Sequence, residues 1–170
     1  MRKFDIGGLL MSQHGSIDTY DFSETLELDP ESDLKLLQPV VFELTVIKMR
    51  HEISVHMQNV KTVAEGRCAR CLDSIKLNIE IPEATRQFLV DLPEHQYDED
   101  EHPLFVDKKH NTIDLYTPLC EEILLHFPSI PLCSVGCKGL CQRCGANLNK
   151  KDCNCDSSSL VSESPFNKLK

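Results

Sequence analysis

The cysteine pattern constrains this chain more than any other feature of its sequence. A Cys-x-x-Cys pair stands at Cys68 and Cys71, and six further cysteines crowd into residues 133–155. In a short secreted chain this density indicates disulfide bridges, whereas in a reducing compartment paired thiols indicate a metal site. The compartment therefore decides how the cysteines are interpreted.

The amino-terminal residues favour a reducing compartment. Met1–Gly8 contain two basic residues but no apolar core of a secretory signal and no small-residue cleavage site. No apolar stretch approaches the roughly 20 residues that a membrane-spanning helix needs. We therefore expect a cytoplasmic protein with no membrane partner, and we interpret the cysteines as metal ligands rather than disulfides.

The charge of the chain limits the partners that it can attract. The formal net charge is −9 at neutral pH, and basic residues form no run. Non-specific nucleic-acid binding depends on neutralising phosphates with lysine and arginine, so any contact with RNA must be local. On charge alone, a basic protein partner is favoured.

Alternating apolar and polar residues predict antiparallel strands in the first part of the chain. The expected strands are 17–28, 40–46, 53–64, 75–81 and 88–92, with a turn over 48–52. Cys68 and Cys71 fall between two of these strands. A β-turn there can form a zinc knuckle, which is a tight turn whose backbone N–H groups point at the thiolates.

One main helix is expected near residues 114–127. Asp114 or Thr117 can cap its first turn, an apolar face follows at helical spacing, and a proline ends it. Cys120 lies on that face and is interpreted as a buried core thiol. His126 is interpreted as a helix-end residue rather than a ligand.

Two polar segments are expected to lack regular structure. Residues 93–111 are rich in acids and contain three histidines, which predicts a solvated loop, with an acidic contact for a basic partner as the alternative. The serine-rich residues 156–170 predict a flexible tail.

The fold class expected is α+β. A β-rich antiparallel domain with one main helix occupies residues 1–131, and a cysteine-rich zinc segment, residues 132–155, docks on Cys68 and Cys71. The pattern does not decide whether the sheet is open or barrel-like.

With Cys120 set aside, eight cysteines remain, which is enough for two tetrahedral four-cysteine zinc sites. Cys141-x-x-Cys144 is followed by Gly145, which can adopt the positive φ of a knuckle, and Cys153-x-Cys155 is the nearest complement. The favoured partition is Cys68, Cys71, Cys133 and Cys137 in site 1, and Cys141, Cys144, Cys153 and Cys155 in site 2. An alternative groups Cys137, Cys141 and Cys144 with Cys153 or Cys155.

The ligand set indicates structural rather than catalytic zinc. A catalytic zinc keeps an open position and usually has histidine or carboxylate nearby, and no histidine lies between Cys133 and Cys155. The βαβ context of a thioredoxin-like pair, a phosphate-binding glycine loop and a GxSxG motif are also missing. We expect a protein that is not an enzyme and has no small-molecule substrate, with a zinc-dependent hydrolase or thiol redox protein as the alternative.

The cysteine strings and the residues around them resemble the YceD family. The strings are Cys68-Ala69-Arg70-Cys71-Leu72, Ile113-Asp114-Leu115, Glu122-Ile123-Leu124-Leu125, Pro128, Pro131-Leu132-Cys133, Cys137-Lys138-Gly139-Leu140-Cys141-x-x-Cys144-Gly145-Ala146-Asn147-Leu148-Asn149 and Cys153-x-Cys155. Order and spacing agree over about residues 40–155, whereas residues 165–170 resemble a shortened form of the family's tail. The resemblance implies a non-catalytic ribosome biogenesis factor that supports synthesis, processing or stability of large-subunit (23S) ribosomal RNA.

The resemblance also implies a pre-ribosomal particle as the partner, touched through ribosomal RNA or a basic ribosomal protein. An RNA contact would use the basic residues around the knuckles, namely Arg67, Arg70, Lys138, Arg143, Lys150 and Lys151. The acidic charge of the whole chain favours a protein or ribonucleoprotein contact instead.

Overall fold

The computed structural model describes residues 3–29, 32–91 and 103–155, which form two compact units. Unit 1 contains the described parts of residues 1–66 and 76–129, and unit 2 those of residues 67–75 and 130–170. Residues 67–75 therefore belong with the carboxy-terminal segment rather than with the strands on either side of them. The predicted flexible tail lies outside the described residues.

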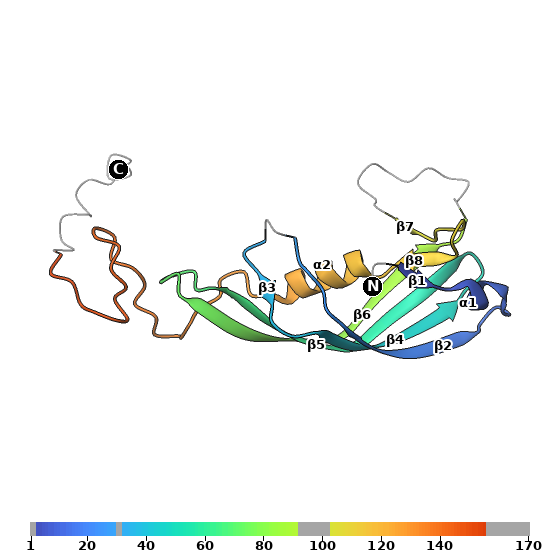
Figure 1. Ribbon diagram of the computed structural model, residues 1–170, viewed down its shortest axis with the longest axis horizontal. Helices are drawn as coiled ribbons and strands as arrows, with labels where there is room; N and C mark the ends of the chain where they lie inside the picture. The colour runs from blue at the N-terminus through green and yellow to red at the C-terminus, as the bar shows by residue number, and fades with distance from the viewer. Residues whose placement is uncertain (1–2, 30–31, 92–102, 156–170) are drawn as a thin grey trace, which may run out of the picture. The chain divides into compact units, whose positions relative to one another are not determined.

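Unit 1 is built on long β-strands (Figure 1). The elements in chain order are β1 (Lys3–Asp5), α1 (Gly7–Met11), β2 (Ile17–Glu24), β3 (Lys35–Leu36), β4 (Val40–Lys48), β5 (Glu52–Arg67), β6 (Ser74–Leu89), β7 (Leu104–Phe105), β8 (Thr112–Asp114) and α2 (Tyr116–His126). None of the helices in the described residues has the length and hydropathy that crossing a bilayer requires. The predicted β-rich fold with one main helix is confirmed.

The strands form two open sheets. The main sheet has the order β2-β4-β5-β6-β7, with β3 also paired to β5, and a small second sheet pairs β1 with β8. The path of the described strands runs from one edge to another without closing, so nothing supports a barrel-like arrangement. The pairing of β6 with β7 is parallel, which departs from the wholly antiparallel sheet that was predicted.

β6 is one continuous strand where two were predicted. Its buried positions alternate up to Ile81, but Pro82 and Glu83 are both exposed before Ala84 is buried again. This change of phase breaks the alternation in the sequence while the strand continues through Phe88. The predicted turn between β4 and β5 is found at residues 49–51.

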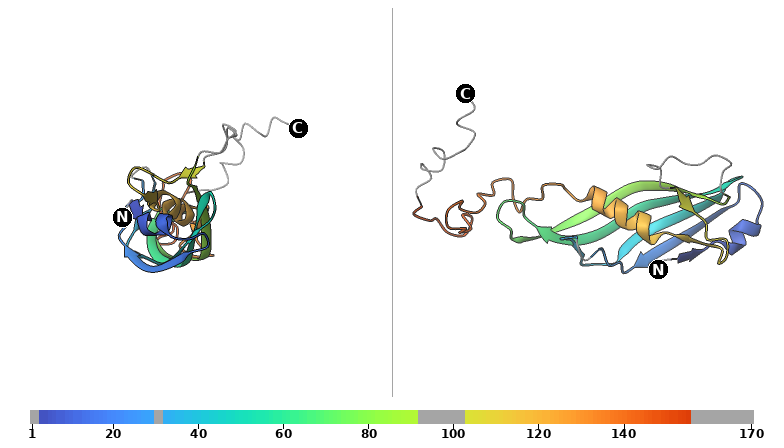
Figure 2. Two further views of the ribbon diagram at one scale, coloured as in Figure 1. Left: turned by 90° about the vertical axis from the view of Figure 1, so that its right-hand side faces the viewer. Right: turned by 90° about the horizontal axis from the view of Figure 1, so that it is seen from above.

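The core of unit 1 lies between the main sheet and α2, and the strands curve around this helix (Figure 2). Leu119 and Ile123 of α2 pack in the same hydrophobic cluster as Val55 and Met57 of β5. Cys120, predicted to be buried, is half-buried and packs against this cluster. The apolar stripe of the helix therefore fills the concave side of the sheet.

Two carboxylates fix α2 in place. Asp114 Oδ1 accepts hydrogen bonds from the backbone N–H groups of Tyr116 at 2.9 Å and Thr117 at 3.3 Å, so Asp114 caps the first turn. Glu122, which is 8% exposed, forms an ion pair with Arg86 of β6. His126 Nδ1 lies 2.9 Å from the Glu122 carbonyl oxygen, in the last turn as predicted.

The predicted acidic loop lies partly outside the described residues, which begin again at residue 103. Leu104 and Phe105 form β7, and Asp107 pairs with Thr112 across a tight turn. The proposed acidic contact rested mainly on residues 94–101, outside the part that the structure describes.

Candidate metal centres

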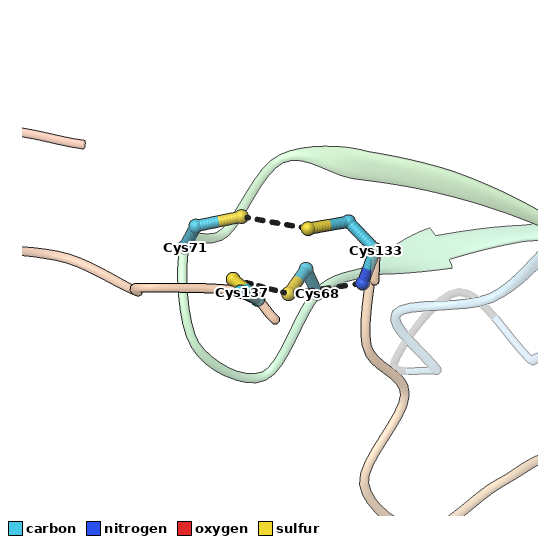
Figure 3. A group of neighbouring side chains, drawn as sticks. All are labelled: Cys68, Cys71, Cys133 and Cys137. Carbon is cyan, nitrogen blue, oxygen red and sulfur yellow. Dashed lines mark hydrogen bonds between the residues drawn. The ribbon is translucent and has the colours of Figure 1, made fainter. Parts of the chain in front are cut away.

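Site 1 lies wholly within unit 2, at the turn between β5 and β6 (Figure 3). Cys68 Sγ and Cys137 Sγ are 3.8 Å apart, and Cys71 Sγ and Cys133 Sγ are 3.6 Å apart. A tetrahedral zinc ion with Zn–S bonds of about 2.3 Å places its sulfur atoms ~3.8 Å apart, whereas a disulfide needs about 2 Å. The spacing fits four ligands around one ion and does not fit two bridges.

Backbone donors converge on the Cys68 sulfur. The Cys133 N–H donates to Cys68 Sγ at 3.4 Å, and the N–H groups of Arg70 and Cys71 also donate to it. Burial alone would raise the pKa of Cys68, but these donors prevail and lower the pKa to about 6. The turn is thus arranged to hold a thiolate.

The thiols of site 1 cannot all ionise without a cation. The Asp73 N–H donates to the Cys71 sulfur, yet burial and the thiols of Cys68, Cys133 and Cys137 raise the pKa of Cys71 to about 12. The like charges of neighbouring thiolates repel, and a divalent cation among them removes this repulsion. A divalent cation among the four residues would therefore favour the ionised form of the whole donor set.

Site 2 repeats this chemistry at the other end of unit 2. Cys141, Cys144, Cys153 and Cys155 present sulfur atoms that all lie within 4.8 Å of one another. The N–H groups of Cys144 and Arg143 lower the pKa of Cys141 to about 6, whereas the Cys144 thiol and burial raise the pKa of Cys155 to about 12. Site 2 is more exposed than site 1, in which three of the four cysteines are buried.

The two knuckles share one backbone conformation. The N–H of Cys68 donates to the Asp73 carbonyl at 2.8 Å, and the N–H of Cys141 donates to the Ala146 carbonyl at 2.8 Å. The residue after the second cysteine has a positive φ in both turns, +61° at Leu72 and +69° at Gly145. Glycine adopts this conformation freely, whereas leucine is strained in it.

We expect Leu72→Gly to stabilise unit 2 by roughly 0.5 kcal/mol, because relief of the left-handed strain exceeds the entropy that a glycine loses on folding. The leucine side chain is 57% exposed, so its removal loses little packing. Gly145→Ala should destabilise unit 2 by about 1 kcal/mol for the converse reason. Amide hydrogen exchange of the zinc-loaded chain measures both changes, and effects of the same sign would show that the turns do not share this conformation.

The structure groups the eight cysteines in the partition that the sequence favoured. Cys137 lies with Cys68, Cys71 and Cys133, and not with Cys141 as in the alternative partition. Four thiolates in a compact set suit zinc, whose structural sites are tetrahedral and rich in cysteine. Metal binding itself, and zinc as the metal, stay predictions.

All six basic residues predicted to contact RNA are exposed and lie in unit 2. They are Arg67, Arg70, Lys138, Arg143, Lys150 and Lys151. Two of them also hold the unit together, because Arg70 Nη1 donates to the Cys137 carbonyl at 3.1 Å and Lys150 Nζ donates to Asp73 Oδ1 at 2.8 Å. Contact with RNA stays a prediction for every one of them.

Three polar residues that the cysteine spacing does not reveal also belong to the metal centres. Asn149 Nδ2 donates to Cys137 Sγ at 3.3 Å, and Asn147 Nδ2 donates to Asp73 Oδ2 at 3.0 Å. The one sequence signal that could have found the asparagines is their place between the ligands of site 2.

A polar cluster on β5 and β6 has the connectivity of a hydrolase triad. Ser54 Oγ is 3.1 Å from His56 Nε2, and His56 Nδ1 is 3.3 Å from Glu83 Oε1. Thr85 Oγ1 shares the same Nδ1 at 3.2 Å, and Ser54 is only 8% exposed. A nucleophile must be accessible and must face oxyanion donors, so we interpret these residues as structural contacts, within β5 for Ser54 and across to β6 for Glu83 and Thr85.

Comparison with known proteins connects the last two thirds of the chain, which contain all its cysteines, to one family. The family model described as "Large ribosomal RNA subunit accumulation protein YceD" matches residues 57–170. The uncharacterized protein Rv2926c of Mycobacterium tuberculosis is 34% identical over 85 residues, 49% of this chain and 39% of the relative. The chloroplastic large ribosomal RNA subunit accumulation protein YCED homolog 1 of Arabidopsis thaliana is 40% identical over 43 residues, 25% of this chain and 13% of the homolog.

The chain spans 39% of the length of the mycobacterial relative. No solved structure matches.

Proposed function

The chain belongs to the YceD family, and on that basis we propose that it supports the accumulation of large-subunit ribosomal RNA as a binding protein without catalytic activity. The name of the Arabidopsis relative, a large ribosomal RNA subunit accumulation protein homolog, supports this role. The proposal places the chain in ribosome biogenesis, with a pre-ribosomal particle as its partner.

In this proposal, structural zinc holds unit 2 in its folded form. Cys68, Cys71, Cys133 and Cys137 would hold one ion, and the four cysteines of site 2 the other. Four thiolates complete the tetrahedral coordination of zinc and leave no position for a substrate or an activated water. The metal would therefore supply folding energy rather than chemistry.

The proposal of an RNA contact rests on one observation, which is that unit 2 is far less acidic than the rest of the chain. The chain as a whole has a formal net charge of −9, yet the described residues of unit 2 contain six basic and only two acidic side chains, so their net charge stays near zero even when two zinc ions on eight thiolates add −4. Exposed lysine and arginine neutralise phosphates, and all six of these basic side chains are exposed. Unit 2 is thus the part of the chain best suited to RNA.

We expect removal of three basic side chains from unit 2 to weaken RNA binding and its dependence on salt. The variant Arg67→Gln/Arg143→Gln/Lys151→Gln leaves Arg70 and Lys150, which hold the unit together, in place. The slope of log K against log salt is negative, and each lost phosphate contact should bring it closer to zero by about 0.7 to 0.9. Three lost contacts should therefore make the slope shallower by roughly 2. Filter binding of a large-subunit ribosomal RNA fragment at several salt concentrations measures this slope.

The matched control removes the same charge from exposed positions of unit 1, with Lys35→Gln/Lys61→Gln/Lys76→Gln. This control should bind RNA with the affinity and slope of the unchanged chain. Equal losses in both variants would overturn the RNA contact at unit 2. Absence of RNA binding together with capture of basic ribosomal proteins would replace it with a protein partner.

A further inference from the structure

Hydrogen bonds link the two candidate metal sites through one short segment. Residues 146–152 connect the second knuckle to Cys153, so the ligands of site 2 stand at both ends of the segment. The segment also forms hydrogen bonds at site 1. Asn149 donates to the ligand Cys137, and Asn147 and Lys150 donate to Asp73, which lies in the first knuckle. We propose that Asn149, carried by the loop of site 2, is a positioning residue for Cys137, so that metal in site 2 raises the affinity of site 1 for metal.

Asn149 is bound on both sides of its amide group. Its Nδ2 donates to Cys137 Sγ at 3.3 Å, and its Oδ1 accepts from the backbone N–H of Lys138 at 2.8 Å. The Asn147 Oδ1 accepts from the Asn149 backbone N–H at 2.9 Å and fixes the turn that presents it. A donor aimed at a ligand sulfur orients that ligand and stabilises its thiolate, which is the role of outer-shell groups in metal sites.

The same segment is fastened to the first knuckle through Asp73. The Asp73 carboxylate accepts from Asn147 Nδ2 at 3.0 Å and from Lys150 Nζ at 2.8 Å. The Asp73 carbonyl in turn accepts from the Cys68 N–H at 2.8 Å. One residue of the first knuckle therefore binds the loop with its side chain and a ligand residue with its backbone.

Backbone pairing holds the loop in the register that these contacts need. Leu140 and Asn147 form an antiparallel bridge, and the Leu148 N–H donates to the Gly139 carbonyl at 2.9 Å. Gly139 has a φ of +76°, and a Cβ added there would lie 3.2 Å from the Arg70 carbonyl oxygen. The close approach of the two segments at this position requires glycine.

Metal in site 2 supplies the anchor at the far end of the loop. The near end is closed by the backbone hydrogen bonds from Cys141 to Ala146 and from Gly145 to Cys141, whereas an ion shared by the four cysteines of site 2 would hold Cys153 and Cys155 to the knuckle. Without that ion, the loop keeps only the hydrogen bonds of Asn147, Leu148 and Lys150 as tethers, and Asn149 meets Cys137 at a lower effective concentration. Coupling of this kind is reciprocal, so metal in site 1 also favours metal in site 2.

The test compares the affinity of site 1 for Zn²⁺ in four forms of the full chain by competition with a chelator. The forms are the unchanged chain, Asn149→Ala, Cys153→Ser/Cys155→Ser, and all three substitutions combined. Loss of an outer-shell partner typically lowers metal affinity by about 10- to 100-fold, and we expect a loss in this range for Asn149→Ala and for the emptied site 2. The combined variant should lose no more than either alone, because both changes remove the same contact.

Two further variants separate donation to sulfur from ordinary folding. Asn149→Asp keeps an acceptor for the Lys138 N–H but cannot donate to Cys137 Sγ, so its affinity should fall as far as that of Asn149→Ala. Gln142→Ala, at an exposed position inside the second knuckle, should leave site 1 unchanged. With Co²⁺ as the probe, the thiolate-to-cobalt absorption of site 1 should shift in Asn149→Ala and stay fixed in Gln142→Ala.

Three outcomes overturn the inference. They are an affinity of site 1 within twofold of the unchanged chain after site 2 is emptied, additive losses in the combined variant, or an Asn149→Asp variant that binds as tightly as the unchanged chain. The inference rests on the proposed metal binding and not on the RNA contact. A chain without metal in either site refutes the metal proposal as a whole, whereas two filled and independent sites refute this inference alone.

Discussion

Cys68→Ser is expected to remove one of two bound zinc ions and to unfold the first knuckle. Cys68 is fully buried, and its sulfur accepts backbone hydrogen bonds from three residues, so serine cannot replace it as a ligand. Structural zinc contributes roughly 10 kcal/mol or more of apparent binding energy in small zinc-dependent folds. Because unit 2 has few buried apolar residues besides its cysteines, loss of the ion should expose its amides to exchange.

Mass spectrometry under native conditions counts the zinc ions, and hydrogen exchange locates the loss of structure. Cys141→Ser should likewise lose one ion, from site 2. Cys120→Ser is the matched control, because Cys120 packs against the core of unit 1, and it should keep both ions. A Cys68→Ser chain that still binds two zinc ions, or an unchanged chain purified in reducing buffer without metal, would contradict the assignment of site 1.

Glu122→Ala is expected to destabilise unit 1 by about 3 kcal/mol, which corresponds to a fall of roughly 10 °C in melting temperature. The Glu122 carboxylate pairs with Arg86, and both side chains are largely shielded from water, with exposed fractions of 11% and 26%. Alanine would leave the guanidinium half-buried and unpaired, which costs more than the pair itself contributes. The change should weaken the packing of α2 against β6, which the ion pair joins.

Urea unfolding followed by circular dichroism measures this loss, since the chain contains no tryptophan to report it by fluorescence. Glu121→Ala removes the neighbouring, exposed carboxylate and should stay within about 0.5 kcal/mol of the unchanged chain. Arg86→Met/Glu122→Leu should recover much of the stability, because an apolar pair can replace a buried ion pair. A Glu122→Ala chain as stable as the Glu121→Ala control would show that the ion pair does not hold the helix.

The strands of the sheet could be predicted from the sequence because the alternation of buried and exposed residues depends only on neighbours in the chain. Val40, Phe42, Leu44 and Val46 of β4 are buried, and polar or at least partly exposed residues separate them. The same reasoning failed where pairing depended on distant residues. The pattern contained no sign that β7 would join β6 in parallel, and the change of phase at Pro82 hid the continuity of β6.

The two knuckles could be predicted from the sequence for a similar reason. A Cys-x-x-Cys turn closes within six residues, and its backbone hydrogen bonds join neighbours in the chain. The positive φ after the second cysteine was anticipated at Gly145 but not at Leu72, where the residue type argues against it. The backbone hydrogen bonds that close the turn outweigh a local preference of this size.

The sequence by itself determined the donor chemistry: eight cysteines in spacings that suit tetrahedral metal, on a chain rich in alternating strands. Only the tertiary structure decided which thiols share a site, because Cys68 and Cys137 are 69 residues apart and Cys71 and Cys133 are 62 apart. It also decided that Asn149 of the second loop donates to a sulfur of the first site. The spacing of residues in the sequence shows which ligands can meet within one turn. Contacts between distant segments depend on the path of the backbone through the whole fold.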